Sequence, residues 1–411
     1  MKTLKFKLKK LKKSQYKAIK DFSHYSNNLY NYGLYITKKY FEETNKYIGY
    51  NKLVNEVQQN ENYKLLPAQS AQQIIKLIDK NFRSFFALLR KKNMGQYTSD
   101  VNSPKFKKKG DCFNIIYTFQ NSRLKNNILT LDISREYKKQ NDIKLKIPFN
   151  YSIDGKIKQI IIKPINKGKF FNCYIQYEEY KIEVNYGLDK KKYLSLDLGL
   201  DNLAACISST GHSFLLNGKP LKSYNCWYNK RKAKLVSELK LKNNKYWSNQ
   251  LSKIEQNRYW FIDNYFNQYV SKIIKFCIEN KIANIVCGYN ESWKQEINLG
   301  KRNNQNFVNI PYYLFKRKLG NKCNEYGLNF IQQEESYTSK CSFLDKESVE
   351  KHDQYLGKRV KRGLFKSQEG RLLNADVNGS ANILRKVIGD AVYDQPIVGL
   401  MFNPVKINCY T

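Results

Sequence analysis

The order in which strand and helix patterns follow one another in the C-terminal half constrains the fold of this chain most. Three short apolar runs separated by turns come first, namely YLSLDLGL, NLAACIS and HSFLL. After them the pattern reads as a long basic helical stretch from about Trp227 to Glu279, the strand ANIVCGY, a helix around Tyr312–Glu325, the strand LNFIQQ, a polar insertion and a final helix from near Asp376. Strands that alternate with helical patterns in this way are typical of an α/β domain.

The first half of the chain has two different patterns. Residues 4–9, LKFKLK, alternate apolar and basic side chains as an edge strand does, and residues 14–92 read as helices broken near Gly49 and Pro67. Between residues 104 and 183, short runs rich in β-branched and aromatic residues alternate with turn residues. We predict an all-β module, plausibly a small barrel, at residues 1–12 and 93–186, with a helical insertion at 13–92.

The charge of the chain indicates a polyanionic partner. Lys and Arg number 73 against 35 Asp and Glu, a formal excess of +38, and such a field repels itself unless it is neutralised. Nucleic acid is the favoured partner, and the alternatives are charge that serves solubility or an anionic membrane. No apolar run approaches the roughly 20 residues of a spanning helix, and no apolar stretch follows the basic N-terminus. We therefore expect a cytoplasmic, nucleoid-associated protein with no membrane partner.

Several basic or amide side chains are candidate phosphate contacts. The helix after Pro67 has an apolar stripe and an opposite face of Gln and Lys, which is either solvated or in contact with nucleic acid. Basic clusters also occur in PKFKKKG, in GKRNNQN and in the polar insertion near the C-terminus. The candidates are Gln73, Lys76, Lys107, Lys108, Lys301, Arg302 and Arg371.

Two acids occupy positions where a nuclease of the RNase H-like fold needs them. Three antiparallel strands followed by α-β-α-β-α is the order of that fold, although periodicity alone leaves other α/β topologies open. In YLSLDLG, Asp197 shares a strand face with Ser195, opposite a row of leucines, and a buried carboxylate without a partner is costly. Asp376 lies at the first turn of the last helix, where it is either a helix cap or a second metal ligand.

The third acid is absent from its usual place. The fourth strand ends in IVCGYN and has no acid before Glu291 in the following loop. The fifth strand of such a sheet lies about 4.8 Å from the fourth, and it ends in QQEES, so Glu334 or Glu335 can reach across one strand spacing. Period-two alternation cannot point both glutamates inward.

Four stretches together resemble TnpB (OrfB), the insertion-sequence proteins related to Fanzor and to the type V CRISPR effectors. They are LDLGLDNLAA, VCGYNESWKQEINLGKRNNQNFVNIPY, EESYTSKCSFLD and NADVNGSANILRK. The resemblance covers nearly the whole chain and implies a multidomain fold, with a wedge-like β-barrel domain, a helical recognition insertion and a RuvC nuclease domain of the RNase H-like type at 187–411. One branch of the family places its glutamate two residues before YTS, which matches Glu335, with Glu334 and Glu291 as the alternatives.

The resemblance implies an RNA-guided DNA endonuclease that uses an RNA from the 3′ end of its own element. It cuts double-stranded DNA beside a short adjacent motif. Asp197 would bridge two Mg²⁺ ions about 3.5–4 Å apart, with Glu335 and Asp376 each holding one, and Mn²⁺ as a possible substitute. The competing hypotheses are a guided DNA-binding repressor that no longer cuts and a transposase or integrase. The sequence does not distinguish a monomer from a dimer.

The chain departs from its relatives at a zinc-binding insertion. Nine cysteines are scattered without any CxxC pair. Cys341 matches the first of four zinc ligands in many relatives, and His352 is the only nearby substitute for the other three. Because a structural zinc site needs four ligands, we expect no zinc in the degenerate insertion at about 336–372, which is instead a basic loop on nucleic acid or a mobile segment.

Overall fold

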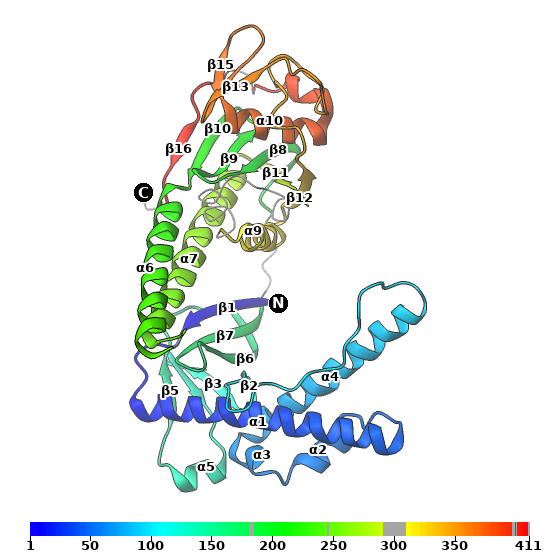
Figure 1. Cartoon of the computed structure of the whole chain (residues 1–411), viewed down its shortest axis with the longest axis vertical. Helices are drawn as coiled ribbons and strands as arrows, with labels where there is room; N and C mark the ends of the chain where they lie inside the picture. The colour runs from blue at the N-terminus through cyan, green and yellow to red at the C-terminus, as the bar shows by residue number, and fades with distance from the viewer. Residues whose placement is uncertain (181–184, 245, 291–309, 397–398, 400, 410–411) are drawn as a thin grey trace. The chain divides into compact units, whose positions relative to one another are not determined.

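The computed structural model describes residues 1–180, 185–244, 246–290, 310–396, 399 and 401–409. The chain divides into two compact units, Met1–Ile182 and Glu183–Thr411 (Figure 1). Within the described ranges, no helix is both long enough and apolar enough to cross a bilayer.

The strands of the first unit form two antiparallel sheets. The larger sheet has the order β1-β7-β6-β2, and the smaller one has the order β3-β4-β5. Their bounds are β1 (Lys2–Lys7), β2 (Ile115–Thr118), β3 (Ser122–Lys125), β4 (Ile128–Leu131), β5 (Leu145–Pro148), β6 (Gly155–Ile165) and β7 (Phe170–Glu179), with a short helix α5 (Arg135–Gln140) between β4 and β5. The predicted N-terminal strand pairs with β7, with Leu4 opposite Ile175. Closure of the two sheets into a barrel stays a prediction.

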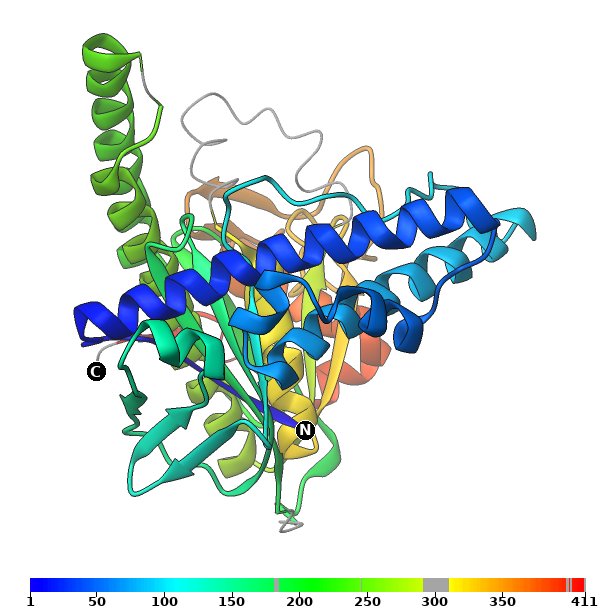
Figure 2. The ribbon, with the colours of Figure 1, turned by 90° about the horizontal axis from the view of Figure 1, so that it is seen from below.

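Four helices lie between β1 and β2 in the chain. They are α1 (Lys13–Thr44), α2 (Tyr50–Val57), α3 (Glu61–Leu65) and α4 (Ala68–Asn93). The predicted breaks near Gly49 and Pro67 are present, and a further break between α2 and α3 was not predicted. The α4 helix packs its apolar stripe against α1 and runs at an angle to it, away from α1 toward the end of α4 (Figure 1). Figure 2 shows the same helices from below. A Cβ placed on Gly33 of α1 would lie 2.7 Å from Ile78 Cδ1, so this glycine permits the close approach of the two helices.

The second unit is built on one six-stranded sheet of order β12-β11-β8-β9-β10-β16. The strands are β8 (Asp189–Leu198), β9 (Asn202–Ser208), β10 (His212–Asn217), β11 (Ile282–Tyr289), β12 (Asn329–Glu334) and β16 (Val405–Ile407). β9 runs antiparallel to both β8 and β10, whereas β11 runs parallel to β8 and to β12. The first five of these strands lie at the positions that the sequence pattern predicts.

Helices cover both faces of this sheet. The leucines of β8 pack on one face with α7 (Asn249–Glu279) and α9 (Tyr312–Tyr326). On the other face, Val286 of β11 and Ala205 of β9 pack against α10 (Ala375–Ile388). A 3₁₀ helix, η1 (Gly389–Asp394), follows α10. Because side chains alternate between the faces of a strand, Asp197 lies on the α10 face.

The helical stretch predicted from about Trp227 to Glu279 consists of two helices, and the first of them begins earlier, at Lys219. α6 (Lys219–Asn243) ends before Asn244, which adopts the left-handed conformation at φ 47°. Ser248 then caps α7 by accepting a hydrogen bond from Leu251 N. The two helices run side by side in both views (Figures 1 and 2). Asparagine tolerates the left-handed region and serine favours helix N-caps, so the break has a local cause.

The insertion between β12 and α10 is folded. It contains a three-stranded antiparallel sheet of β13 (Lys358–Lys361), β14 (Leu364–Lys366) and β15 (Leu372–Asn374). The prediction of a basic or mobile loop missed these strands, because the sequence of β13, KRVK, has no alternation of apolar and polar side chains, and all four residues are exposed.

Candidate active site

Asp197 lies near the end of the central strand β8 and faces α10. Its Oδ2 lies 2.5 Å from the position that a Cβ on Gly379 of α10 would occupy, so the helix approaches the carboxylate closely. Part of Asp197 is accessible to water. Burial, followed by the neighbouring charges of Glu335 and Asp376, raises the pKa of Asp197 well above its ordinary value. Asp197 is therefore electrostatically coupled to both other acids.

Glu335 directly follows β12 and extends over the neighbouring strand β11. Its backbone N–H donates to Tyr289 O at 3.0 Å, which continues the pairing of β12 with β11. Its Oε2 lies 2.3 Å from the position that a Cβ on Gly288 would occupy. Burial raises the pKa of Glu335 to about 7, although the nearby Lys316 acts in the opposite direction.

Asp376 lies in the first turn of α10, as the sequence predicts. The Asn374 side chain caps the helix by accepting hydrogen bonds from Asp376 N and Val377 N, both at 3.1 Å. The carboxylate of Asp376 accepts from Asn202 Nδ2 at 2.8 Å and forms an ion pair with Arg359 Nη2 of β13 at 3.0 Å. Asp376 is thus both a residue of the first helical turn and the partner of an arginine from the insertion.

The three acids fit a divalent cation in their chemistry but are not arranged around one point. All three offer carboxylate oxygens, which Mg²⁺ prefers, and burial followed by the charges of the other two acids disfavours the charged form of Asp197. Among the residues that the structure describes, however, no group of three or more His, Cys, Asp or Glu side chains has the arrangement to hold a metal ion, although the charges of Glu335 and Asp376 act on Asp197. Their role as metal ligands stays a prediction.

The alternative glutamates have different surroundings. Glu334 forms an ion pair with Lys386 at 3.1 Å, and its Oε1 accepts from Ser336 N at 2.6 Å. Burial raises the pKa of Glu334, but the hydrogen bonds from Ser336 and Lys386 outweigh it and lower the pKa overall. Glu291 lies outside the described residues.

The sequence does not identify four further residues that contact the three acids or make room for them. Arg359, Asn202, Gly288 and Gly379 all contact or make room for the three acids. The two glycines lie inside predicted elements, where a glycine suggests a close approach of something else, but the identity of the neighbour requires the fold.

The candidate nucleic-acid contacts differ in exposure. Lys76, Lys108 and Arg371 are exposed, and Arg371 pairs with Glu369 at 3.3 Å. Gln73 is half-buried on α4. Lys107 is half-buried with its Nζ 4.0 Å from the centre of the Phe113 ring, and burial lowers its pKa. Lys301 and Arg302 lie outside the described residues.

Cys341 and His352, the remnants of the zinc pattern, have separate partners. The Cys341 thiol is buried and donates to Glu350 O at 3.5 Å. His352 Nε2 lies 2.8 Å from Ser348 O. The absence of zinc remains a prediction.

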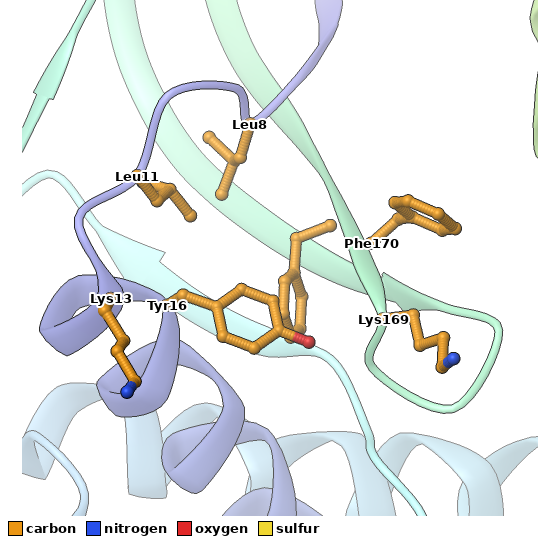
Figure 3. Close-up of a pocket in the computed structure, with 7 residues that line it drawn as sticks. Leu8, Leu11, Lys13, Tyr16, Lys169 and Phe170 are labelled. Carbon is orange, nitrogen blue, oxygen red and sulfur yellow. The ribbon is translucent and has the colours of Figure 1, made fainter. Parts of the chain in front are cut away.

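A pocket in the first unit is unrelated to the three acids. It has a volume of about 370 Å³ and lies between the start of α1 and the β6-β7 hairpin (Figure 3). Leu8, Leu11 and Phe171 supply apolar walls, and Lys13 and Lys169 bring positive charge to it. It contains none of the predicted site residues.

Together the two units define a mixed α/β multidomain protein whose fold resembles the Cas12f1 effectors. A solved structure, the cryo-EM structure of a Cas12f1-sgRNA-target DNA complex, matches with a TM-score of 0.54 at 16% identity, covering 90% of this chain and 82% of that one. At this identity the match concerns the fold alone.

Sequence comparisons give the family. The OrfB_IS605 family model, described as a probable transposase, matches residues 175–294. The model of the Cas12f1-like TNB domain matches residues 312–383. The TnpB-like protein ORF457 of Acidianus two-tailed virus is 26% identical over 211 residues, 49% of this chain and 43% of that protein. The match thus spans less than half the length of this relative. These matches support a member of the TnpB (OrfB) family.

Proposed function

We propose that the chain is a transposon-associated, RNA-guided DNA endonuclease that hydrolyses phosphodiester bonds at Asp197, Glu335 and Asp376. The carrying observation is the coupling of these acids across three elements, because the charges of Glu335 and Asp376 both raise the pKa of Asp197. Carboxylates whose pKa values are strongly raised, as those of Asp197 and Glu335 are, are typical of a functional site. Membership of the TnpB family supports the same activity.

The sheet order supports a RuvC domain of the RNase H-like type. Three consecutive strands run antiparallel, and two further strands are added in parallel beside the first of them. In this chain the central strand β8, the residue after the fifth strand β12 and the last helix α10 would supply the acids, whereas the fourth strand, the usual place of the third acid, has none. The first unit would then be the wedge-like domain with its helical insertion.

Each residue has a role in this proposal. Asp197, Glu335 and Asp376 would hold divalent ions, with Mg²⁺ favoured by the all-oxygen donor set and Mn²⁺ as a substitute. When bound, such ions activate water and stabilise the leaving oxygen of an in-line displacement. The ion pair of Asp376 with Arg359 would have to open for Asp376 to take part, which frees an arginine for the phosphate backbone. No zinc is proposed.

Base pairing with a guide RNA would provide most of the specificity. The excess of basic residues, +38 in total, supports RNA and DNA as partners. The Cas12f1 structure that shares the fold contains an sgRNA and a target DNA. We extend that pair of partners to this chain, with the guide derived from the 3′ end of the element.

A guided DNA-binding protein that does not cut is the second candidate. Two observations favour it: β11 carries glycine rather than an acid at position 288, and Asp376 is paired with Arg359. Strand transfer between paired element ends would instead indicate a transposase.

The test copurifies the full chain with RNA from its native 3′ flank and measures Mg²⁺-dependent cleavage of a target library with randomised flanks. We expect cleavage by the wild type and by Glu334→Ala, and a loss of at least 100-fold for Asp197→Ala and Glu335→Ala, since removing a preorganised electrostatic group costs about this much. Guide-dependent DNA binding should persist in all four proteins.

Each contrary result has a separate meaning. Cleavage that survives Glu335→Ala but not Glu334→Ala would move the ligand to Glu334. Guide-dependent binding without cleavage by the wild type would favour the non-cutting protein.

A further inference from the structure

We propose that Gly288 of β11 is a positioning residue for Glu335, because the missing side chain at position 288 leaves the volume that the glutamate carboxylate occupies beside Asp197. The catalytic meaning of this inference rests on the proposed function. Its structural content, an obligatory pairing of glycine at 288 with glutamate at 335, can be tested independently of cleavage.

The space at position 288 is filled from two sides. A Cβ added to Gly288 would lie 2.3 Å from Glu335 Oε2 and 2.8 Å from Ile383 Cδ1 of α10. Cβ atoms in proteins essentially never make contacts below 3.0 Å, so alanine at 288 requires a neighbour to move. Ile383 is fully buried, whereas Glu335 is partly accessible to water. The glutamate side chain is therefore the neighbour that has room to move.

The strand register explains why the carboxylate and position 288 compete for one volume. Val286 pairs with Ser195, and Gly288 pairs with Gln333. Side chains two residues apart share a face, so position 288, Asp197 and Glu335 all face α10. A side chain at 288 would point between the two acids. The carboxylate of Glu335 reaches the same volume from the next strand.

The backbone of Glu335 cannot shift to make room. Its N–H donates to Tyr289 O at 3.0 Å, and its carbonyl accepts from Thr338 Oγ1 at 2.8 Å. Thr338 is itself held by Asn382 of α10, whose Nδ2 donates to Thr338 O at 2.9 Å. Alanine at 288 should therefore rotate the glutamate side chain away from Asp197 and leave the strand in place.

Two measurements on the full chain test the pairing. The first is a double-mutant cycle in thermal unfolding, with Mg²⁺ removed by a chelator, on the wild type, Gly288→Ala, Glu335→Ala and the double variant. The second is Mn²⁺ binding, followed by electron paramagnetic resonance. Gly399→Ala is the control, because a Cβ there would meet nothing within 4 Å and the residue is not in the left-handed region.

We expect Gly288→Ala to lower the melting temperature, and we expect Glu335→Ala to remove at least half of that loss. We also expect Gly288→Ala to weaken Mn²⁺ binding at least 10-fold, and Gly288→Asp combined with Glu335→Ala to recover part of it. Additive stability losses would overturn the pairing, and so would Mn²⁺ binding that is equal in the wild type and in Gly288→Ala. So would failure to fold in both backgrounds, which would assign Gly288 to packing against Ile383 alone.

The two proposals fail differently. If the wild type does not bind Mn²⁺, the proposed metal site is wrong, and the unfolding cycle alone then decides whether positions 288 and 335 are paired. If the wild type binds Mn²⁺ and Gly288→Ala binds it equally well, only the pairing is wrong.

Discussion

At the scale of single residues, the charged forms of Asp197 and Glu335 oppose folding when no cation is bound. Asp197 and Glu335 both have raised pKa values, mainly because burial disfavours their charged forms. Arg359 offsets part of the charge of Asp376. A divalent ion would therefore stabilise the folded chain as well as serve chemistry, since ligands that bind only the folded state stabilise it.

The raised pKa of Glu335 predicts the pH dependence of stability. The folded-state pKa of about 7 exceeds the ordinary 4.5, so the folded chain binds more protons between these values. The contribution of Glu335 to the free energy of unfolding is fully present below about pH 4.5 and is lost as pH rises through 7. Its upper limit is about 3 kcal/mol. In the presence of a chelator, Glu335→Gln should therefore stabilise the chain more at pH 8 than at pH 5, as measured by chemical unfolding.

Glu334→Gln is the control for this prediction, because its pKa is lowered and the sign reverses. The contribution of Glu334 to the free energy of unfolding is present above its ordinary pKa and is lost as pH falls. The variant should lose stability at pH 8 and change little at low pH. Equal effects of Glu335→Gln at both pH values would contradict the assignment of the raised pKa.

At the scale of elements, α10 holds the segment that follows Glu335. Asn378 Oδ1 accepts from Phe343 N at 3.1 Å, and its Nδ2 donates to Cys341 O at 2.9 Å. Asn382 Nδ2 also donates to Cys341 O, at 2.8 Å. Both asparagines are fully buried. Amide side chains thus fix the backbone around Cys341.

Asn378→Ala should destabilise the chain by about 1–3 kcal/mol, because it leaves buried backbone groups unsatisfied. Chemical unfolding measures the effect, and the exposed Asn28→Ala, which loses a hydrogen bond to Asn62, should cost less than about 0.5 kcal/mol. A similar cost for Asn378→Ala and Asn28→Ala would show that the hydrogen bonds of Asn378 contribute little.

A zinc chelator should leave the unfolding curve of the wild type unchanged, because no zinc is expected in the insertion.

The sequence allows most elements of the second unit to be predicted, because β8, β11 and α10 carry strong apolar periodicity. It also indicates which strand ends carry the acids. The insertion differs, since β13 consists of exposed residues and its order depends on pairing with β14 and β15. The contact of Arg359 with Asp376 could not be predicted, because it depends on where that hairpin returns to α10.

At the scale of the whole molecule, the excess charge of +38 predicts a strong salt dependence of RNA binding. Each neutralised phosphate contributes about −0.7 to the slope of log affinity against log salt for single strands. We expect a slope steeper than about −4 for the guide RNA, corresponding to about six such contacts. Filter binding between low and moderate salt measures it, and a flat response would exclude phosphate contacts as the basis of binding.

Two neighbouring lysines provide a matched comparison. Lys108 is exposed, so Lys108→Gln should make the slope less steep by about 0.7 if it contacts a phosphate. The Lys107 ammonium lies over the Phe113 and Tyr30 rings, so Lys107→Gln should leave the slope unchanged. The reverse result would assign the phosphate contact to Lys107.

The glycine at position 288 also affects how active members of such a family are counted. A survey that asks for an acid on the strand equivalent to β11 would classify this chain as degenerate, because that strand ends in CGY. A survey that asks for an acid on either of two adjacent strands, and for a small residue on the other, would retain it. The second criterion asks whether a carboxylate from one strand can extend into space left free by a small residue on the next, rather than whether an acid stands at one aligned position. It can recover relatives that the first criterion discards.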